Sequence, residues 1–235
     1  MSSLRERLED VRRRVEVAAS RVHRDPADVR LVAVSKTVTP EVIVEAYRLG
    51  QREFGENRLQ EFRDKRSVLD AAGVAARWHM LGHLQSNKAR LAVELFDIIQ
   101  SVGSLKLARL LDRDAAESGR RLPILLEVDF SSSPERSGFK PGDLDAAAAE
   151  LVGLANLEIQ GLMTVAPLGL DAEGQRGVFR TLRIQRDRLA AKHSGARWHH
   201  LSMGMSDDFE LAIEEGATMV RIGRAIFGER PPVQA

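Results

Sequence analysis

The most regular feature of the chain is the alternation of short apolar runs with longer segments that mix apolar and charged residues. Runs such as Leu31-Val32-Ala33-Val34 have the β-branched, apolar composition of buried strands. The segments between them place apolar residues at helical spacing, and several end at a glycine, as the segment before Gly50 does. Eight such units follow one another, with predicted strands over residues 31–36, 52–55, 77–82, 96–102, 123–129, 157–164, 198–202 and 218–222.

An unbroken alternation of strand and helix predicts parallel strands joined by right-handed crossovers. Eight units close as a (β/α)8 or TIM barrel, and 235 residues suit one such domain. We therefore expect an α/β fold in which residues 1–235 form a single TIM-barrel domain; an open doubly wound sheet is the alternative. The intervening helices include a short one over 86–91 and a long one over 175–192.

An extra helix is expected before the first strand. Its predicted buried stripe has apolar residues at helical spacing, separated by Arg and Glu: Leu4, Leu8, Val11, Val15 and Val22.

Composition narrows the class of protein. The 35 basic and 34 acidic residues leave a net charge of +1, which gives no support for nucleic acid as a partner. The absence of cysteine excludes a disulfide framework and thiolate catalysis. The charged N-terminus is no secretory signal, and no apolar run approaches the roughly 18 residues of a membrane helix. A cytoplasmic protein without membrane contact is expected, and a monomer, because no exposed apolar stripe is evident.

The active site of a TIM barrel lies at the C-terminal ends of its strands. Lys36 ends the first predicted strand, and an ammonium group buried there needs a reason. It reaches solvent, pairs with a carboxylate, or serves as an amine nucleophile that forms a Schiff base with an aldehyde. The other residues at predicted strand ends are Asn57, Met80, Gly82, Asp129, Met163, Thr164, Ser202, Arg221 and Gly223.

The loops after the seventh and eighth strands are the usual phosphate site of such barrels. Gly204 and Gly223 would let the backbone approach an anion, and Ser202 or Ser206 could donate a hydroxyl hydrogen bond. Ordinary strand-to-helix turns are the alternative interpretation. A Schiff-base lysine combined with a phosphate site suits pyridoxal 5′-phosphate (PLP) or a phosphorylated sugar, and these two features alone do not decide between them.

Six segments in the same order carry a family resemblance that spans nearly the whole chain. They are VAVSK, FGENRLQE, WHMLGHLQSNK, GLMTVAP, LSMGMSDD and VRIGRAIFG. Together they resemble the pyridoxal phosphate homeostasis protein family, which is similar in fold to the N-terminal barrel of alanine racemases. The resemblance implies a PLP-binding protein of intracellular vitamin B6 homeostasis with no established catalytic activity.

The resemblance also implies roles for individual residues. Lys36 would carry the Schiff base, and Arg221 would face the pyridine nitrogen. The phosphate would be held by Ser202, Gly223 and Arg224, the last through its backbone N–H. Asn57 and Met80 would flank the ring or its substituents.

Two features favour a binder or carrier over an enzyme. An always-protonated Arg221 would keep the pyridine nitrogen unprotonated and make the ring a weak electron sink. In alanine racemases, as the resemblance implies, a tyrosine of a second domain supplies the second acid/base; this chain ends after the eighth unit, and its single tyrosine, Tyr47, lies in a predicted helix. We expect at most weak PLP-dependent side activity, with PLP-dependent apoenzymes as candidate partners. A PLP-dependent amino-acid racemase and a Schiff-base aldolase acting on a sugar phosphate are the alternatives.

Three further groups of residues are candidates for other roles. His79 and His83 lack a carboxylate at ligand spacing, so packing or loop hydrogen bonding is expected and no metal site is predicted. Residues 85–88 lie on the rim, where a partner or ligand role is an option. The loop 131–138 is either a lid over the site or a plain loop.

Overall fold

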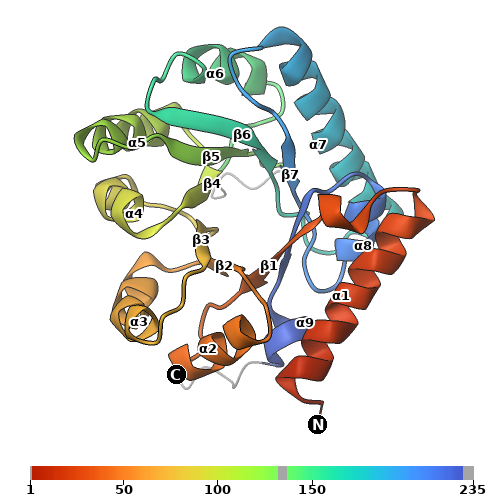
Figure 1. The fold of residues 1–235 in the computed structure, drawn as a ribbon. Helices are drawn as coiled ribbons and strands as arrows, with labels where there is room; N and C mark the ends of the chain where they lie inside the picture. Colours follow the sequence, from red (N-terminus) through yellow and green to blue (C-terminus); the bar gives the residue numbers. More distant parts are fainter. Residues whose placement is uncertain (1, 132–136, 230–235) are drawn as a thin grey trace.

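Eight parallel strands close on themselves in sequence order, β1 to β8, in the computed structural model, which describes residues 2–131 and 137–229 (Figure 1). The barrel closes where β1 pairs with β8, from Arg30 opposite Met219 to Ala33 opposite Ile222. The predicted (β/α)8 barrel is thus confirmed, and the open sheet is excluded. The strands are β1 (Arg30–Val34), β2 (Glu53–Glu56), β3 (Arg77–Met80), β4 (Ile98–Val102), β5 (Leu122–Glu127), β6 (Leu157–Met163), β7 (His200–Ser202) and β8 (Met219–Ile222).

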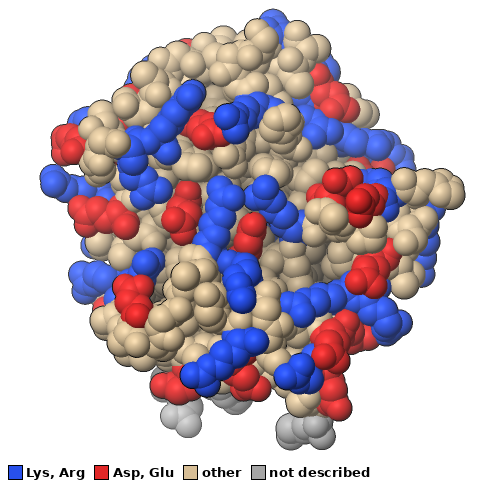
Figure 2. Space-filling view, viewed as in Figure 1, with Lys and Arg blue, Asp and Glu red and all other residues tan. Residues whose placement is uncertain are grey.

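Helices form a ring around the barrel (Figure 1). They are α2 (Pro40–Arg48), α3 (Leu59–Ala71), α4 (Ala89–Leu95), α5 (Leu105–Glu117), α6 (Leu144–Leu151), α7 (Ala172–Lys192), α8 (Phe209–Glu214) and α9 (Arg224–Phe227). Figure 2, in the same view, shows acidic and basic side chains interspersed over the visible face, in keeping with the near-neutral net charge. Within the described ranges, no helix is both long enough and apolar enough to cross a membrane.

The expected N-terminal helix is α1 (Leu4–Arg21), which lies along α8 and α9 (Figure 1). Ser3 and Glu6 form a capping box at its start, which satisfies two backbone N–H groups. The predicted stripe is wrong at one position: Val22 is the residue after the helix and is only half-buried, while Ala18 and Ala19 complete the buried face.

Several element boundaries differ from the prediction; strand β1, for example, ends at Val34 rather than at residue 36. The helix expected over 86–91 is a 3-10 turn (Ser86–Lys88) followed by α4, which continues to Leu95 because no breaker interrupts its sequence. Helix α7 begins at Ala172 rather than 175, because the carboxylate of Asp171 accepts the backbone N–H of Gly174 at 2.8 Å. A short 3-10 turn (Pro26–Asp28) before β1 was not predicted.

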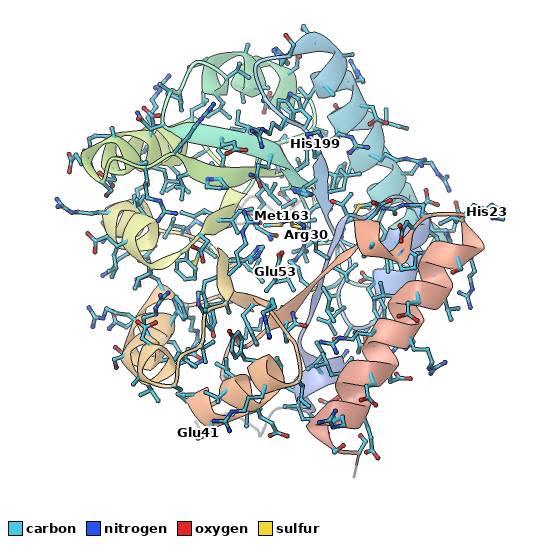
Figure 3. The ribbon with its side chains drawn as sticks, in the orientation of Figure 1. His23, Arg30, Glu41, Glu53, Met163 and His199 are labelled. Carbon is cyan, nitrogen blue, oxygen red and sulfur yellow. The ribbon has the colours of Figure 1, made fainter. Side chains whose placement is uncertain are left out.

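The core has two parts. Large side chains such as Phe54, Phe62 and Trp78 fill the space between strands and helices. Inside the barrel, a smaller group consists of Ile98, Leu125, Met163 and Met219, and Figure 3 labels Met163 near the middle of the ring. The barrel is therefore a packed core, and polar side chains within it need partners of their own.

Candidate functional site

A cavity of about 350 Å³ opens at the C-terminal ends of β1, β2 and β8. This volume is at the lower end of the range for small-molecule sites. Five of the residues chosen from the sequence line it together: Lys36, Asn57, Arg221, Gly223 and Arg224. Because β1 ends at Val34, Lys36 lies on the corner beyond the strand and is partly buried.

Ser202 and Met80 do not line this cavity. Ser202 is fully buried beneath Arg221, and Met80 lines an adjoining hollow that shares Asn57 with the cavity. The hydroxyl that does reach the cavity belongs to Ser206, the other serine considered from the sequence.

Several lining residues were missed by sequence reasoning. Leu81 and Val165 follow β3 and β6 by one and two positions, so extending the strand-end rule slightly would have found them. Glu229 follows α9, and no pattern in the sequence singles it out.

Arg221 is the buried cation of the cavity, with 5% of its surface exposed. Its Nη1 donates to Ser202 Oγ at 2.7 Å, and its Nη2 donates to the Thr164 carbonyl at 2.7 Å. Burial lowers the pKa of Arg221 to about 10, opposed by the nearby charges of Asp208 and Glu127. The guanidinium therefore stays protonated at neutral pH.

Behind Arg221, buried polar side chains continue into the barrel. Ser202 Oγ donates to Gln100 Oε1 at 2.6 Å, and Gln100 Nε2 lies 2.7 Å from His79 Nδ1. We call Arg221, Ser202, Gln100 and His79 the interior hydrogen-bond chain. The amide nitrogen of Gln100 can only donate, so His79 Nδ1 accepts and the imidazole proton sits on Nε2.

The far end of the interior hydrogen-bond chain meets a carboxylate. His79 Nε2 lies 3.0 Å from Glu53 Oε2. The other carboxylate oxygen, Glu53 Oε1, lies 3.6 Å from Arg30 Nη1. Figure 3 labels Arg30 and Glu53 near the middle of the ring. Complete burial lowers the pKa of His79, with Glu53 opposing, so the imidazole is neutral at neutral pH. The hydrogen bonds that link these four residues therefore all run from Arg221 into the barrel interior.

The loops after β7 and β8 are tied to each other at the cavity rim. The Ala225 backbone N–H donates to Ser206 Oγ at 3.3 Å, and the Arg224 guanidinium pairs with the Asp207 carboxylate. That ion pair raises the pKa of Arg224, and both of its partners line the cavity. Gly204 has φ +92°, and a Cβ there would lie 2.7 Å from Ala212 Cβ, so this loop requires glycine.

The remaining candidates lie elsewhere. Tyr47 is in α2, where the Arg52 guanidinium lies 4.2 Å from its ring centroid. His79 is engaged in the core and His83 is exposed. Among the described residues, no three His, Asp or Glu side chains are grouped as metal ligands. In the loop 131–138, positions 132–136 lie outside the described residues.

The chain matches a known domain family over most of its length. The model of the alanine racemase N-terminal domain matches residues 7–231, so the chain belongs to that domain family. A likeness to the alanine racemase of Clostridium difficile 630, at 18% identity and a TM-score of 0.72, shows the same fold; it covers 98% of this chain and 57% of that one.

Closer relatives narrow the assignment. The pyridoxal phosphate homeostasis protein of Pseudomonas aeruginosa is 41% identical over 98% of this chain and 97% of its own. The structure of PipY from Synechococcus elongatus, solved with PLP bound, is 42% identical, with a TM-score of 0.86 and coverage of 96% of this chain and 100% of that one. The chain therefore belongs to the pyridoxal phosphate homeostasis protein family, as the sequence resemblance predicted.

Proposed function

We propose that this protein binds PLP in the cavity at the C-terminal ends of β1, β2 and β8, with Lys36 as its covalent anchor, and acts in vitamin B6 homeostasis. The observation that carries the proposal is that a lysine and a buried arginine face one small cavity whose rim is built from the loops after β7 and β8. Relatives at about 40% identity are named for PLP homeostasis, and PipY has been solved with PLP bound.

The cavity fits the cofactor chemically. PLP supplies an aldehyde, which condenses with an amine to form a Schiff base and release water, together with a phosphate and a pyridine nitrogen. Lys36 offers the amine, and the buried guanidinium of Arg221 offers donors to the nitrogen. The backbone at Gly223 and Arg224, joined by the Ser206 hydroxyl, would hold the phosphate.

The other predicted residues would differ in how directly they contact PLP. Asn57 would touch the ring directly, whereas Met80 would contact the ligand only where the adjoining hollow meets the cavity. Ser202 would act through Arg221, because its hydroxyl is already engaged on both sides.

We propose a carrier without robust catalysis, in one cytoplasmic, monomeric domain that passes PLP to PLP-dependent apoenzymes. Arg221 supports this, because a protonated guanidinium donates to a pyridine nitrogen and does not protonate it. Its two bonds to Ser202 and Thr164 keep it in that role.

An absorption spectrum tests the proposal. We expect the purified protein incubated with PLP to absorb at about 420 nm, and we expect Lys36→Ala to lose that band. If the wild-type protein stays colourless with PLP, the proposal fails and a Schiff-base aldolase acting on a sugar phosphate becomes the function to test. If PLP binds and the protein exchanges the Cα proton of an amino acid in heavy water at enzymatic rates, the racemase alternative replaces the carrier.

A further inference from the structure

The backbone beside Lys36 is held in an unusual conformation. Thr37 has φ +64°, in the left-handed region that β-branched residues rarely adopt. Its backbone N–H donates to Glu61 Oε1 at 2.6 Å, and its hydroxyl donates to the Lys36 carbonyl at 2.6 Å. The peptide group after Lys36 is therefore tied to a side chain of α3.

The peptide group before Lys36 is tied to the same helix. Lys65 Nζ donates to the Ser35 carbonyl at 3.0 Å. Ser35 is itself fully buried, and its hydroxyl donates to Glu56 Oε1 at 2.8 Å. Both peptide groups that flank Lys36 thus have a partner on α3.

The two α3 partners form one ion pair. Lys65 Nζ lies 2.6 Å from Glu61 Oε1 and 3.2 Å from Glu56 Oε1. The side chains of Lys65, Glu61 and Glu56 are 11%, 24% and 0% exposed. Solvent and salt therefore weaken the attraction between these charges far less than that of a surface ion pair. Burial raises the pKa of Glu61, but the hydrogen bonds from Lys65 and Thr37 outweigh it and keep this carboxylate ionised at neutral pH.

We propose that Glu61 and Lys65 are positioning residues for Lys36, which hold the corner after β1 so that the amine points into the cavity. The inference rests on the proposed function of Lys36 as the PLP anchor. Without Glu61, the peptide group between residues 36 and 37 is free to rotate and return Thr37 to a negative φ. That rotation changes the direction in which the Lys36 side chain extends from the backbone.

Two ligands separate positioning from general damage to the pocket. PLP can form the Schiff base, whereas pyridoxine 5′-phosphate, an alcohol of the same shape, binds only through non-covalent contacts. For Glu61→Met we expect the affinity for PLP to fall about tenfold, the scale of the left-handed penalty at Thr37, while the affinity for pyridoxine 5′-phosphate stays unchanged. Absorbance titration measures the first and isothermal calorimetry the second.

A matched control and a rescue sharpen the test. Asp70→Asn breaks another i, i+4 ion pair of α3, with Arg66 at 2.8 Å, that does not touch Lys36, and we expect no change in PLP affinity. In a Thr37→Gly background, where glycine adopts a positive φ without strain, Glu61→Met should cost less than in the wild type.

Equal losses for both ligands, no loss of PLP affinity in Glu61→Met, or an undiminished loss in the Thr37→Gly background would each overturn the positioning role. A wild-type protein that binds no PLP would instead refute the proposed function, so the two failures are distinguishable.

Discussion

Replacing Gln100 by methionine should destabilise the protein strongly, although the two side chains are similar in size. Gln100 is fully buried and bridges Ser202 Oγ and His79 Nδ1 at 2.6 and 2.7 Å. In Gln100→Met, a hydroxyl proton and an imidazole lone pair lose their partner inside the barrel. Each such buried group costs about 1–3 kcal/mol, so we expect a loss of about 3 kcal/mol of unfolding free energy after the gain from a more apolar side chain.

Urea denaturation and a thermal scan of the variant measure this loss. For a chain of this size, about 3 kcal/mol corresponds to a Tm lowered by about 6–12 °C. Gln160→Met is the matched control. Gln160 Oε1 is buried and, among the described residues, accepts no hydrogen bond, while Gln160 Nε2 donates to the partly exposed Glu158 at 3.1 Å; replacing the amide should therefore change stability by about 1 kcal/mol or less.

The interior hydrogen-bond chain also predicts non-additivity. Ser202→Ala and Gln100→Met both break the same Ser202–Gln100 bond, so the double variant should lose less than the sum of the single losses, by about 0.5–3 kcal/mol. A Gln100→Met protein as stable as the wild type, or strictly additive losses, would refute the reasoning that these buried side chains depend on one another.

Three other predictions concern pH, packing and backbone. Burial, and to a lesser extent the charge of Arg30, lowers the pKa of His200 from 6.5 to about 4. The contribution of the neutral imidazole to stability is therefore complete above pH 6.5 and is lost as the pH falls towards 4. We expect His200→Gln to flatten the pH dependence of the unfolding free energy between these two values. Replacing the fully buried Phe62 by alanine should lower the free energy of unfolding by about 3–5 kcal/mol, as measured by urea denaturation. Val68→Ala, on the exposed side of the same helix, should lower it by less than about 0.5 kcal/mol. Gly204→Ala, at φ +92° and 2.7 Å from Ala212 Cβ, should lower Tm by several degrees and weaken PLP binding, and an unchanged Tm would contradict the need for glycine there.

The barrel itself could be predicted because its information is local. Strands such as Leu122–Glu127 are short apolar runs, and helices such as Leu105–Glu117 place buried apolar residues at helical spacing. The details that differ lie at the ends of elements: Asp171 caps α7 three residues earlier than predicted, and Val22 lies beyond the end of α1. These differences do not alter the order of the strands.

The site was predictable only where position along a strand decides the outcome. The strand-end rule brought Lys36, Asn57 and Arg221 to one cavity, because all strands of a parallel barrel end on one face. It also selected Ser202, whose side chain points into the barrel and meets Gln100, a residue 102 positions away. Only barrel closure brings these two together, and no local pattern encodes that contact.

The same limit applies to the corner beside Lys36. Glu61 and Lys65 stand at i, i+4 spacing on α3 and form an ion pair at 2.6 Å. What the spacing cannot indicate is that the pair reaches across to the Ser35 carbonyl and the Thr37 N–H, since those contacts depend on how α3 packs against β1 and β2.

In the proposed function, Arg221 would make the site better suited to holding PLP than to using it in catalysis. With a pKa lowered by burial only to about 10, Arg221 stays protonated at pH 7 and would act as a fixed donor toward the ligand. A PLP ring whose nitrogen receives such a donor stays unprotonated and withdraws electrons weakly, which leaves a charge developing at a substrate carbon without stabilisation. Exchange of a Schiff base from one amine to another needs no such electron sink, because it requires only attack by the second amine. In the proposed function, the arrangement of Arg221 would therefore suppress turnover while leaving transfer of PLP to another lysine available.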